Sequence, residues 1–206
     1  NPVEIAKTIM KGFGGTAERI GIVIIAGTII GVFLEKTGAA LTMADTILRL
    51  VGPKRPALAM SLIGYITSIP VFCDSGFVIL SALNKSLSKK TGVSMAVMAT
   101  ALSTGLYATH TLVPPTPGPI AAANNLHADL GMVIFMGLMV AIPVTMAGYL
   151  WATRFASQYQ VLADTSISYE ELKEKFQNLP SALTAFTPLV LPIVLIALKS
   201  VANFPS

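Results

Sequence analysis

Long uncharged apolar runs alternate with short charged segments along this chain. The runs cover residues 20–34, 57–72, 93–106, 131–152 and 183–198. A transmembrane helix needs about 20 apolar residues to cross a hydrocarbon core about 30 Å thick. Run 131–152 has that length. Run 20–34 corresponds to only about 22 Å of helix, so it can span the membrane only if flanking residues extend it or the bilayer is locally thinner. The pattern predicts an all-α membrane protein with several transmembrane helices.

The charged segments predict how these helices are oriented. Segments 35–56, 84–92 and 154–181 contain four, three and three Lys or Arg residues, and segment 124–130 contains none. Cytoplasmic loops of membrane proteins are enriched in Lys and Arg. We therefore expect the three basic segments, including a cytoplasmic loop at about 154–181, on one side of the membrane and segment 124–130 on the other.

The apolar region 57–83 fits this orientation best as a re-entrant helical hairpin. A single crossing would place the basic segments before and after it on opposite sides, against the positive-inside rule. If the chain instead enters the membrane, turns at Cys73-Asp74-Ser75-Gly76 and returns, both basic segments stay on the same side. The two arms of this hairpin, about 16 and 7 residues long, are each too short to span the membrane. Residues 1–19, with three basic residues, then lie outside, which argues for the alternative of a single crossing.

Run 93–106 leads into a segment that cannot form a continuous helix. The four prolines that break it are Pro114, Pro115, Pro117 and Pro119. Each proline lacks an N–H and clashes with the preceding turn. At membrane depth such a break persists only where it is buried in protein or lines a wet cavity. Two interrupted apolar segments in one membrane chain indicate a transporter site, although prolines can also simply kink a helix whose neighbours repair its hydrogen bonds.

Asp74 is the first candidate for chemistry, because it is the only Asp or Glu between Asp45 and Asp129. A charged side chain at membrane depth costs about 2.5–3.5 kcal/mol on translocon scales. We therefore predict that Asp74 carries a proton or hydrogen-bonds the solute, with Ser75 and Gly76 beside it in the substrate site. The alternative is an ordinary Asp-Ser-Gly turn.

His110 is the second candidate, since its titration range suits proton coupling and its ring N–H can bind a carboxylate. Its alternative role is structural, as a hydrogen-bonded side chain that stabilises the proline-broken segment. A short helix over residues 119–123 would point its positive N-terminal end at a bound carboxylate. The remaining predicted substrate-binding positions in this segment are Thr109, Thr111, Thr116 and Gly118.

Composition narrows the class of protein. The 206 residues are 53% hydrophobic and 12% charged, against about a quarter charged in an average soluble domain. The net charge of +4 comes from scattered Lys and Arg residues, so no nucleic-acid partner is expected. No metal-ligand spacing or phosphate-binding loop occurs, and Cys73 is the single cysteine. An intramembrane enzyme is disfavoured, because no second acidic residue pairs with Asp74 at depth.

The beginning of the chain adds two expectations. Gly12, Gly14 and Gly15 predict a flexible stretch before the first apolar run. The sequence starts at Asn1-Pro2 without an initiator Met, and we interpret it as a piece of a longer protein.

Several motifs closely resemble those of the gluconate permease family, the gluconate:proton symporters of the ion transporter superfamily. They are the segments 70–80 (PVFCDSGFVIL), 109–119 (THTLVPPTPGP) and 125–131 (NLHADLG) and, more weakly, 12–16 (GFGGT). The resemblance implies a transporter built from inverted repeats and about twice this length. Residues 1–206 then form a partial transporter domain, most of the first repeat, with the second repeat absent.

The resemblance also implies a function. It suggests proton-coupled import of gluconate or a related small hydroxy-carboxylate by a multi-pass protein of the bacterial inner membrane, without cofactor or catalysis. The expected partners are the carboxylate, protons and lipid, and a homo-oligomer is left open. Family members often carry Glu-Val-Gly where this chain has Asp74-Ser75-Gly76, which leaves open a different substrate such as D-serine or glycerate. A non-transporting membrane scaffold subunit is the remaining alternative.

Overall fold

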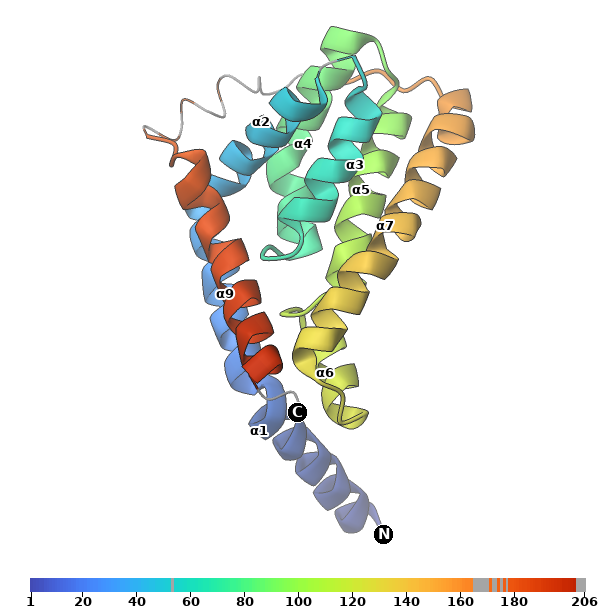
Figure 1. Cartoon of the computed structure of the whole chain (residues 1–206). Helices are drawn as coiled ribbons and strands as arrows, with labels where there is room; N and C mark the ends of the chain where they lie inside the picture. The colour runs from blue at the N-terminus through green and yellow to red at the C-terminus, as the bar shows by residue number, and fades with distance from the viewer. Residues whose placement is uncertain (53, 165–170, 172–173, 175, 177, 203–206) are drawn as a thin grey trace.

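The computed structural model describes residues 1–52, 54–164, 171, 174, 176 and 178–202. Within this part, every regular element is a helix, which confirms the predicted all-α class (Figure 1). The helices are α1 (Pro2–Lys36), α2 (Ala39–Val51), α3 (Pro56–Thr67), α4 (Cys73–Thr91), α5 (Met95–Leu112), α6 (Pro117–Asn125), α7 (Leu130–Arg154), the 3₁₀ turn η1 (Ala156–Gln158) and α9 (Ala182–Ala202).

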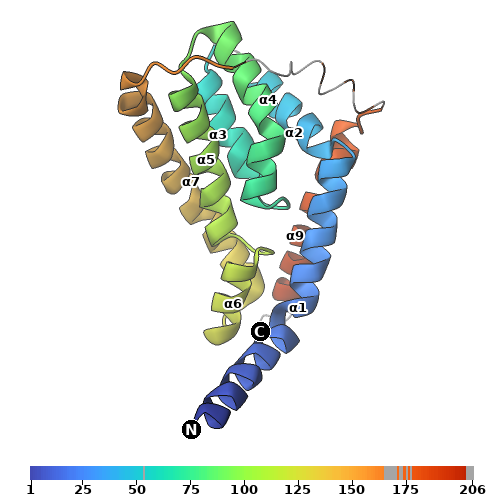
Figure 2. The same cartoon turned by 180° about the vertical axis from the view of Figure 1, so that it is seen from behind.

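The helices form two arms with a hairpin between them. In Figure 1 and in the reverse view of Figure 2, α1 and α9 make up one arm, α5, α6 and α7 make up the other, and α3 and α4 lie between the arms at one end. The ends of the three predicted basic segments gather at that same end, while the connection from α6 to α7 lies at the opposite end. This is the relative placement that the charge pattern predicted.

The core is built around α5, which packs against α3, α4 and α7. Glycines allow these helices to approach closely. A Cβ atom at Gly64 of α3 would lie 2.6 Å from the carbonyl oxygen of Leu102, and one at Gly105 of α5 would overlap the carbonyl oxygen of Ser61. The Tyr65 hydroxyl donates a 2.8 Å hydrogen bond to the carbonyl oxygen of Leu138 on α7. Small residues at helix crossings are a common way for membrane helices to associate.

The first helix is longer than its apolar run. α1 has 35 residues, about 52 Å at a rise of ~1.5 Å per residue. The prediction of a flexible stretch at Gly12, Gly14 and Gly15 is wrong, because these residues lie inside α1. The helix starts early because Asn1 accepts a hydrogen bond from the N–H of Val3 and Pro2 occupies the first turn, where its missing N–H costs nothing.

A sharp bend follows α1 and leads into an amphipathic helix. Gly38 adopts φ 72°, and the last turns of α1 make an angle of 70° with α2. The buried face of α2 includes Leu41, Met43 and Ile47. α2 lies at the same end of the molecule as the start of α3 and the end of α4 (Figure 1).

The hairpin of α3 and α4 is present, but its turn differs from the prediction. α3 ends at Thr67 and residues 68–72, called here the hairpin tip, connect it to α4. Residues 73–76 are not the turn: they form the first turn of α4, which has 19 residues instead of the predicted arm of about 7. The reason is local, because Pro70 cannot continue α3 and the extended Phe72 (φ −59°, ψ 141°) starts a new helix at Cys73.

The proline-broken helix is present where it was expected. α5 ends at Leu112, and Val113 is extended with φ −116° and ψ 122°. Residues 113–116, called here the α5–α6 break, contain a cis peptide bond between Pro114 and Pro115. α6 begins at Pro117, so the short helix expected over 119–123 is slightly longer than predicted.

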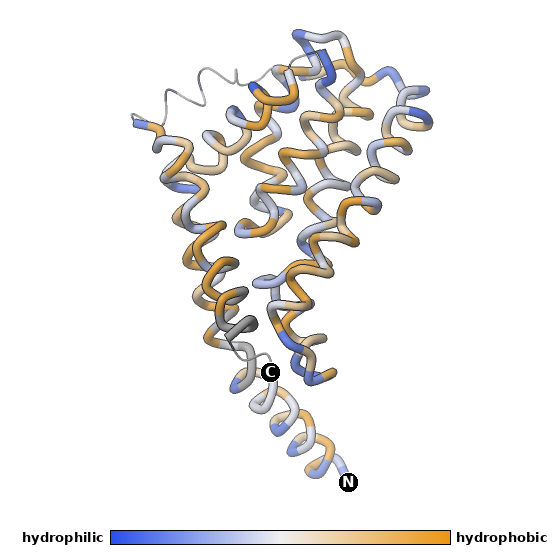
Figure 3. The backbone as a smooth tube through the Cα atoms, viewed as in Figure 1, coloured by the Kyte–Doolittle hydropathy of each residue, from blue (hydrophilic) through white to orange (hydrophobic). Residues whose placement is uncertain are grey.

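Length and composition identify one helical segment among the described residues, Leu130–Gln158, as sufficient alone to cross a membrane. The bent pair of α1 and α2 would supply a second if it counts as one span. Figure 3 shows hydrophobic residues along the middle of the helices and hydrophilic residues gathered towards the ends. Large apolar side chains are exposed on the outer surface of several helices, including Phe135 and Trp151 of α7 and Leu191 of α9.

Candidate functional site

The hairpin tip and the α5–α6 break meet in the middle of the molecule. The ring of Phe72 at the tip contacts the ring of His110 near the end of α5, with centroids 5.8 Å apart and an interplanar angle of 63°. A small pocket between them is lined by residues of both segments, among them Phe72, Pro115 and Thr116. The fold thus joins two interruptions that are about forty residues apart in the sequence.

Asp74 lies in the first turn of α4, directly beside this junction. The Cys73 thiol donates a hydrogen bond of 3.6 Å to its Oδ1 atom. The Asp74 side chain is exposed, on a side that the described residues do not cover, and its charge is close enough to act on Tyr107 and His110. Asp74 therefore follows the hairpin tip in the first turn of α4 instead of forming the tip, and its side chain is accessible.

His110 is half-buried in the last turn of α5. Its Nδ1 atom is shielded from solvent and has no hydrogen-bond partner among the described residues. Buried polar atoms are nearly always paired in folded proteins, and an exception calls for an explanation such as a functional role. The arrangement brings together the two residues that were predicted to handle protons, Asp74 and His110.

Three of the predicted substrate residues have packing positions instead. Gly76 is buried, its N–H donates to the carbonyl oxygen of Phe72 at 2.8 Å, and a Cβ atom there would lie 3.0 Å from the Leu106 side chain. Thr109 is fully buried, with its hydroxyl turned back to the carbonyl groups of its own helix. Ser75 is half-buried between the tip and the body of α4. Of these three residues, Gly76 limits how closely α4 and α5 approach.

The other three predicted substrate residues lie along α5, the break and α6. Thr111 is exposed, and its hydroxyl donates to the carbonyl oxygen of Tyr107 at 2.7 Å. Thr116 is buried and donates to the carbonyl oxygen of Val113 at 2.8 Å, which stabilises the turn of the break. Gly118 is exposed in the first turn of α6 with open space around it. Thr111 and Gly118 are thus accessible, while Thr116 is structural.

Two helix N-termini lie at this junction without a side-chain cap. α4 starts at the hairpin tip and α6 starts at the break, and the two helices run from there towards opposite ends of the molecule (Figure 1). Neither Phe72 nor Thr116 caps its helix with a side chain. The N–H groups of a first helical turn lack intrahelical partners and carry partial positive charge. The junction therefore offers two helix N-termini to an anionic group. α6 contributes only the N–H of Gly118, because Pro117 and Pro119 have none and the N–H of Ile120 donates to the carbonyl oxygen of Thr116.

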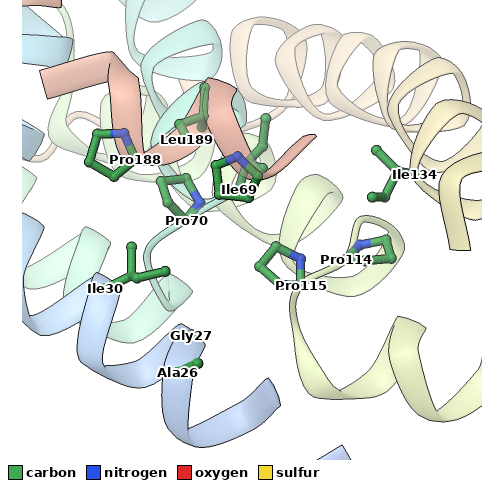
Figure 4. A pocket seen from close by; sticks show the side chains of 11 residues that line it. Ala26, Gly27, Ile30, Ile69, Pro70, Pro114, Pro115, Ile134, Pro188 and Leu189 are labelled. Atoms are coloured by element: carbon green, nitrogen blue, oxygen red, sulfur yellow. The ribbon is translucent and has the colours of Figure 1, made fainter. Parts of the chain in front are cut away.

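A cavity of about 190 Å³ lies behind the junction, on the side of α1, α7 and α9. Figure 4 shows prolines from three elements around it, including Pro70, Pro115 and Pro188. Its full lining is Ala26, Gly27, Ile30, Ile69, Pro70, Pro114, Pro115, Ile134, Pro188, Leu189 and Pro192. These side chains are apolar, so the junction has a polar side at Asp74 and an apolar side here. Pro117 and Pro119 lie outside this lining, in the first turn of α6.

Sequence reasoning missed two features of the site. Tyr107 is 55% exposed and lies on the same face of α5 as His110 and Thr111, three and four residues before them; that spacing could have identified it. The second missed feature is that α1 lines the pockets at the junction. No sequence signal predicted this position of α1, because it depends on contacts with segments that are distant in the sequence. In the part of the chain that the structure describes, no group of three or more His, Cys, Asp or Glu side chains could hold a metal ion.

Comparison with known proteins identifies the family. The model of the GntP family permeases matches residues 1–205. The chain is 38% identical to an uncharacterised permease of Haemophilus influenzae over 97% of this chain and 43% of that protein. It is 34% identical to a gluconate permease of Pseudomonas aeruginosa, covering 98% of this chain and 46% of that protein. It is also 34% identical to the D-serine transporter DsdX of Escherichia coli, covering 98% of this chain and 45% of that protein.

These matches extend over almost the whole chain, which spans less than half the length of each relative. No solved structure matches the chain. The relatives are permeases and transporters, which implies a membrane protein without enzymatic function. The resemblance inferred from the two interrupted segments is thereby confirmed, and this chain belongs to the GntP family of permeases.

Proposed function

We propose that the full-length protein is a proton-coupled symporter that imports gluconate or a related small hydroxy-carboxylate across the bacterial inner membrane. Residues 1–206 supply most of the first of two inverted repeats. The observation that carries the proposal is the junction itself, where two uncapped helix N-termini lie beside Asp74 and His110. Such broken helices at mid-depth are typical of the substrate sites of secondary transporters.

The residues at the junction have separate roles in this proposal. The first-turn N–H groups of α4 hold the substrate carboxylate together with the N–H of Gly118, since Pro117 and Pro119 of α6 have no N–H to donate. Thr111 contacts the substrate from the exposed side. Asp74 takes up and releases the proton, and His110 couples that step to binding because it lies within the electrostatic influence of the Asp74 carboxylate. The predicted substrate residues Ser75, Gly76, Thr109 and Thr116 act through the backbone that they position.

The membrane arrangement follows from the charge pattern. We place the ends that carry Lys36, Lys85 and Arg154 in the cytoplasm, together with the segment 154–181, of which the structure describes only part. The connection at 126–129 then lies on the other side of the membrane. α3 and α4 form a re-entrant hairpin in this arrangement, since their connected ends stop halfway along the molecule (Figure 1).

Uptake by proteoliposomes tests this function. The full-length permease is reconstituted, and accumulation of labelled gluconate is measured with an inward proton gradient, without a gradient, and with a protonophore. Symport predicts accumulation above equilibrium only with the gradient. Uptake that ignores the gradient refutes proton coupling, and no uptake of any small carboxylate favours a non-transporting scaffold.

A second substrate class has a specific observation in its favour. The relative from Escherichia coli that is 34% identical to this chain is a D-serine transporter, and this chain carries the short carboxylate of Asp74 beside the hydroxyl of Ser75. A shorter carboxylate with a neighbouring hydroxyl suits a smaller or zwitterionic solute. Competition of unlabelled D-serine, glycerate and gluconate against labelled gluconate decides between these solutes.

A further inference from the structure

Helix α1 contacts both interrupted segments through two glycines. A Cβ atom built at Gly31 would lie 3.3 Å from the carbonyl oxygen of Pro70 in the hairpin tip. A Cβ atom at Gly27 would lie 4.0 Å from the carbonyl oxygen of Pro115 in the α5–α6 break. Residues four apart share one face of a helix, so a single stripe of α1 contacts both segments.

This stripe faces the apolar side of the junction. Figure 4 shows Gly27 and Ile30 of α1 opposite Pro70 and Pro115, around the cavity of about 190 Å³. The small pocket between tip and break is likewise lined by Gly27 together with residues of both segments. The stripe contacts the tip at Pro70, four residues before Asp74.

The other glycines of α1 have no such contacts. Cβ atoms at Gly12, Gly14 and Gly15 would meet nothing within 4 Å, and one at Gly21 would meet only the Ala17 side chain of the same helix at 4.0 Å. Close approach to another segment is therefore confined to Gly31 and, less tightly, Gly27. The helix itself does not require glycine at these positions, since glycine weakens a helix by about 1 kcal/mol relative to alanine.

We infer that the Gly27–Gly31 stripe of α1 is a positioning element of the transport site, which sets the separation between the hairpin tip and the α5–α6 break. This inference rests on the proposed function. Gly31 packs closely against the tip two residues before Phe72 and four before Asp74, and Gly27 lies next to the break that follows His110. Small displacements matter here, because misplacement of binding groups by about 1 Å costs up to about a hundredfold in enzyme sites.

The two contact distances predict a graded result in the full-length permease. At Gly31→Ala the tip must move by a few tenths of an ångström, because a 3.3 Å contact is tighter than normal packing. We expect the half-saturation concentration for gluconate to rise about three- to tenfold, with the maximal rate within twofold of wild type. Gly27→Ala adds only an ordinary contact at 4.0 Å and should raise the half-saturation concentration less than Gly31→Ala does. The matched control Gly21→Ala, whose Cβ atom would meet only Ala17 of the same helix, should transport like wild type. Gly31→Leu should abolish uptake.

A variant at Gly64, a glycine in the contact of α3 with α5, distinguishes an effect on the position of the tip from an effect on the stability of the fold. At Gly64→Ala the new Cβ atom would lie 2.6 Å from the Leu102 carbonyl oxygen, within the contact of α3 with α5. This variant should lower the melting temperature and the amount of folded protein without changing the half-saturation concentration of what remains. If Gly31→Ala behaves in that same way, or like wild type, the inference is wrong.

A substrate-independent measurement keeps this test separate from the proposed function. Cys73 is 5% exposed and follows the hairpin tip directly, so its rate of reaction with a membrane-permeant maleimide reports the position of the tip. With the other cysteines of the full chain replaced, Gly31→Ala should change this rate at least twofold and Gly21→Ala should not. An unchanged rate overturns the inference, whereas a wild-type protein that takes up no gluconate refutes only the proposed function.

Discussion

At the scale of single residues, Asp74 combines three properties that rarely occur together. It lies in an otherwise uncharged stretch, it begins a helix, and its carboxylate is exposed next to Tyr107 and His110. A residue that serves only as a turn needs no carboxylate at membrane depth, where its charge is costly. The structure also shows that residues 73–76 are helical, which removes the argument that Asp74 is there for turn geometry.

Replacing Asp74 by asparagine should separate coupling from binding. Asn keeps the size and the hydrogen-bonding capacity of the side chain but cannot carry a proton. We expect Asp74→Asn to abolish gradient-driven accumulation of gluconate while counterflow exchange persists. The matched control is Asp129→Asn at the N-terminus of α7, where the Asp129 side chain accepts from the N–H of Met132 at 2.8 Å and Asn caps equally well. Unimpaired uphill uptake by Asp74→Asn would show that no proton passes through this carboxylate.

His110 should contribute to substrate affinity. A hydrogen bond to a charged group is worth about 1.5–3 kcal/mol, which corresponds to a factor of about 10 to 150 in affinity. We expect His110→Ala to raise the half-saturation concentration for gluconate by that order while the protein remains in the membrane. The control is His127→Asn in the loop before α7, because His127 has φ 51° and asparagine tolerates this conformation. Wild-type binding by His110→Ala would place the carboxylate site elsewhere.

At the scale of helices, glycines decide how closely the elements of the site approach. Gly64 and Gly105 bring α3 and α5 together above the junction, and a Cβ atom at Gly137 of α7 would overlap the carbonyl oxygen of Leu112 beside the α5–α6 break. The hairpin tip and the break lie next to these crossings and keep some helical hydrogen bonds of their own, such as those from the N–H of Val71 to Thr67 and from the N–H of Val113 to Thr109.

Alanine at Gly105 should destabilise the fold. Its Cβ atom would overlap the Ser61 carbonyl oxygen, and overpacking of this kind costs about 1–3 kcal/mol. We expect Gly105→Ala to lower the thermal unfolding midpoint in detergent. Gly14→Ala serves as the matched control, because nothing lies within 4 Å of its Cβ position and the helix gains up to about 1 kcal/mol. Equal midpoints for the two variants would contradict the close packing of α3 against α5.

At the scale of the whole molecule, the placement of charged ends can be measured directly. Lys36 is the last residue of α1, Lys54 lies between α2 and α3, and Lys85 and Lys90 lie in the second half of α4. Single cysteines at these four positions, in a Cys73→Ser background of the full-length protein, should all react with an impermeant maleimide from the cytoplasmic side. A cysteine at Asn125 should react only from the other side. Labelling of positions 36 and 85 from opposite sides would mean that α3 and α4 cross the membrane once instead of forming a re-entrant hairpin.

The sequence by itself determined the features that depend on neighbouring residues. The long apolar runs predicted helices, and the cluster of prolines located the α5–α6 break, because helix formation and helix interruption are local properties of the backbone. The motifs around Asp74 and His110 were sufficient to identify the family. The boundaries were less secure: the turn of the hairpin was assigned to 73–76 and lies at 68–72, where Pro70 stops α3.

Only the tertiary structure decided which segments meet and which side chains are accessible. The contact of Phe72 with His110, the exposure of Asp74, the burial of Gly76 and the approach of Gly31 to Pro70 all join residues or surfaces that are distant in the sequence. Such contacts depend on how whole helices pack, and packing is set by the sum of many weak interactions with no local signature. For the same reason the glycines of α1, which look alike in the sequence, differ completely in their surroundings.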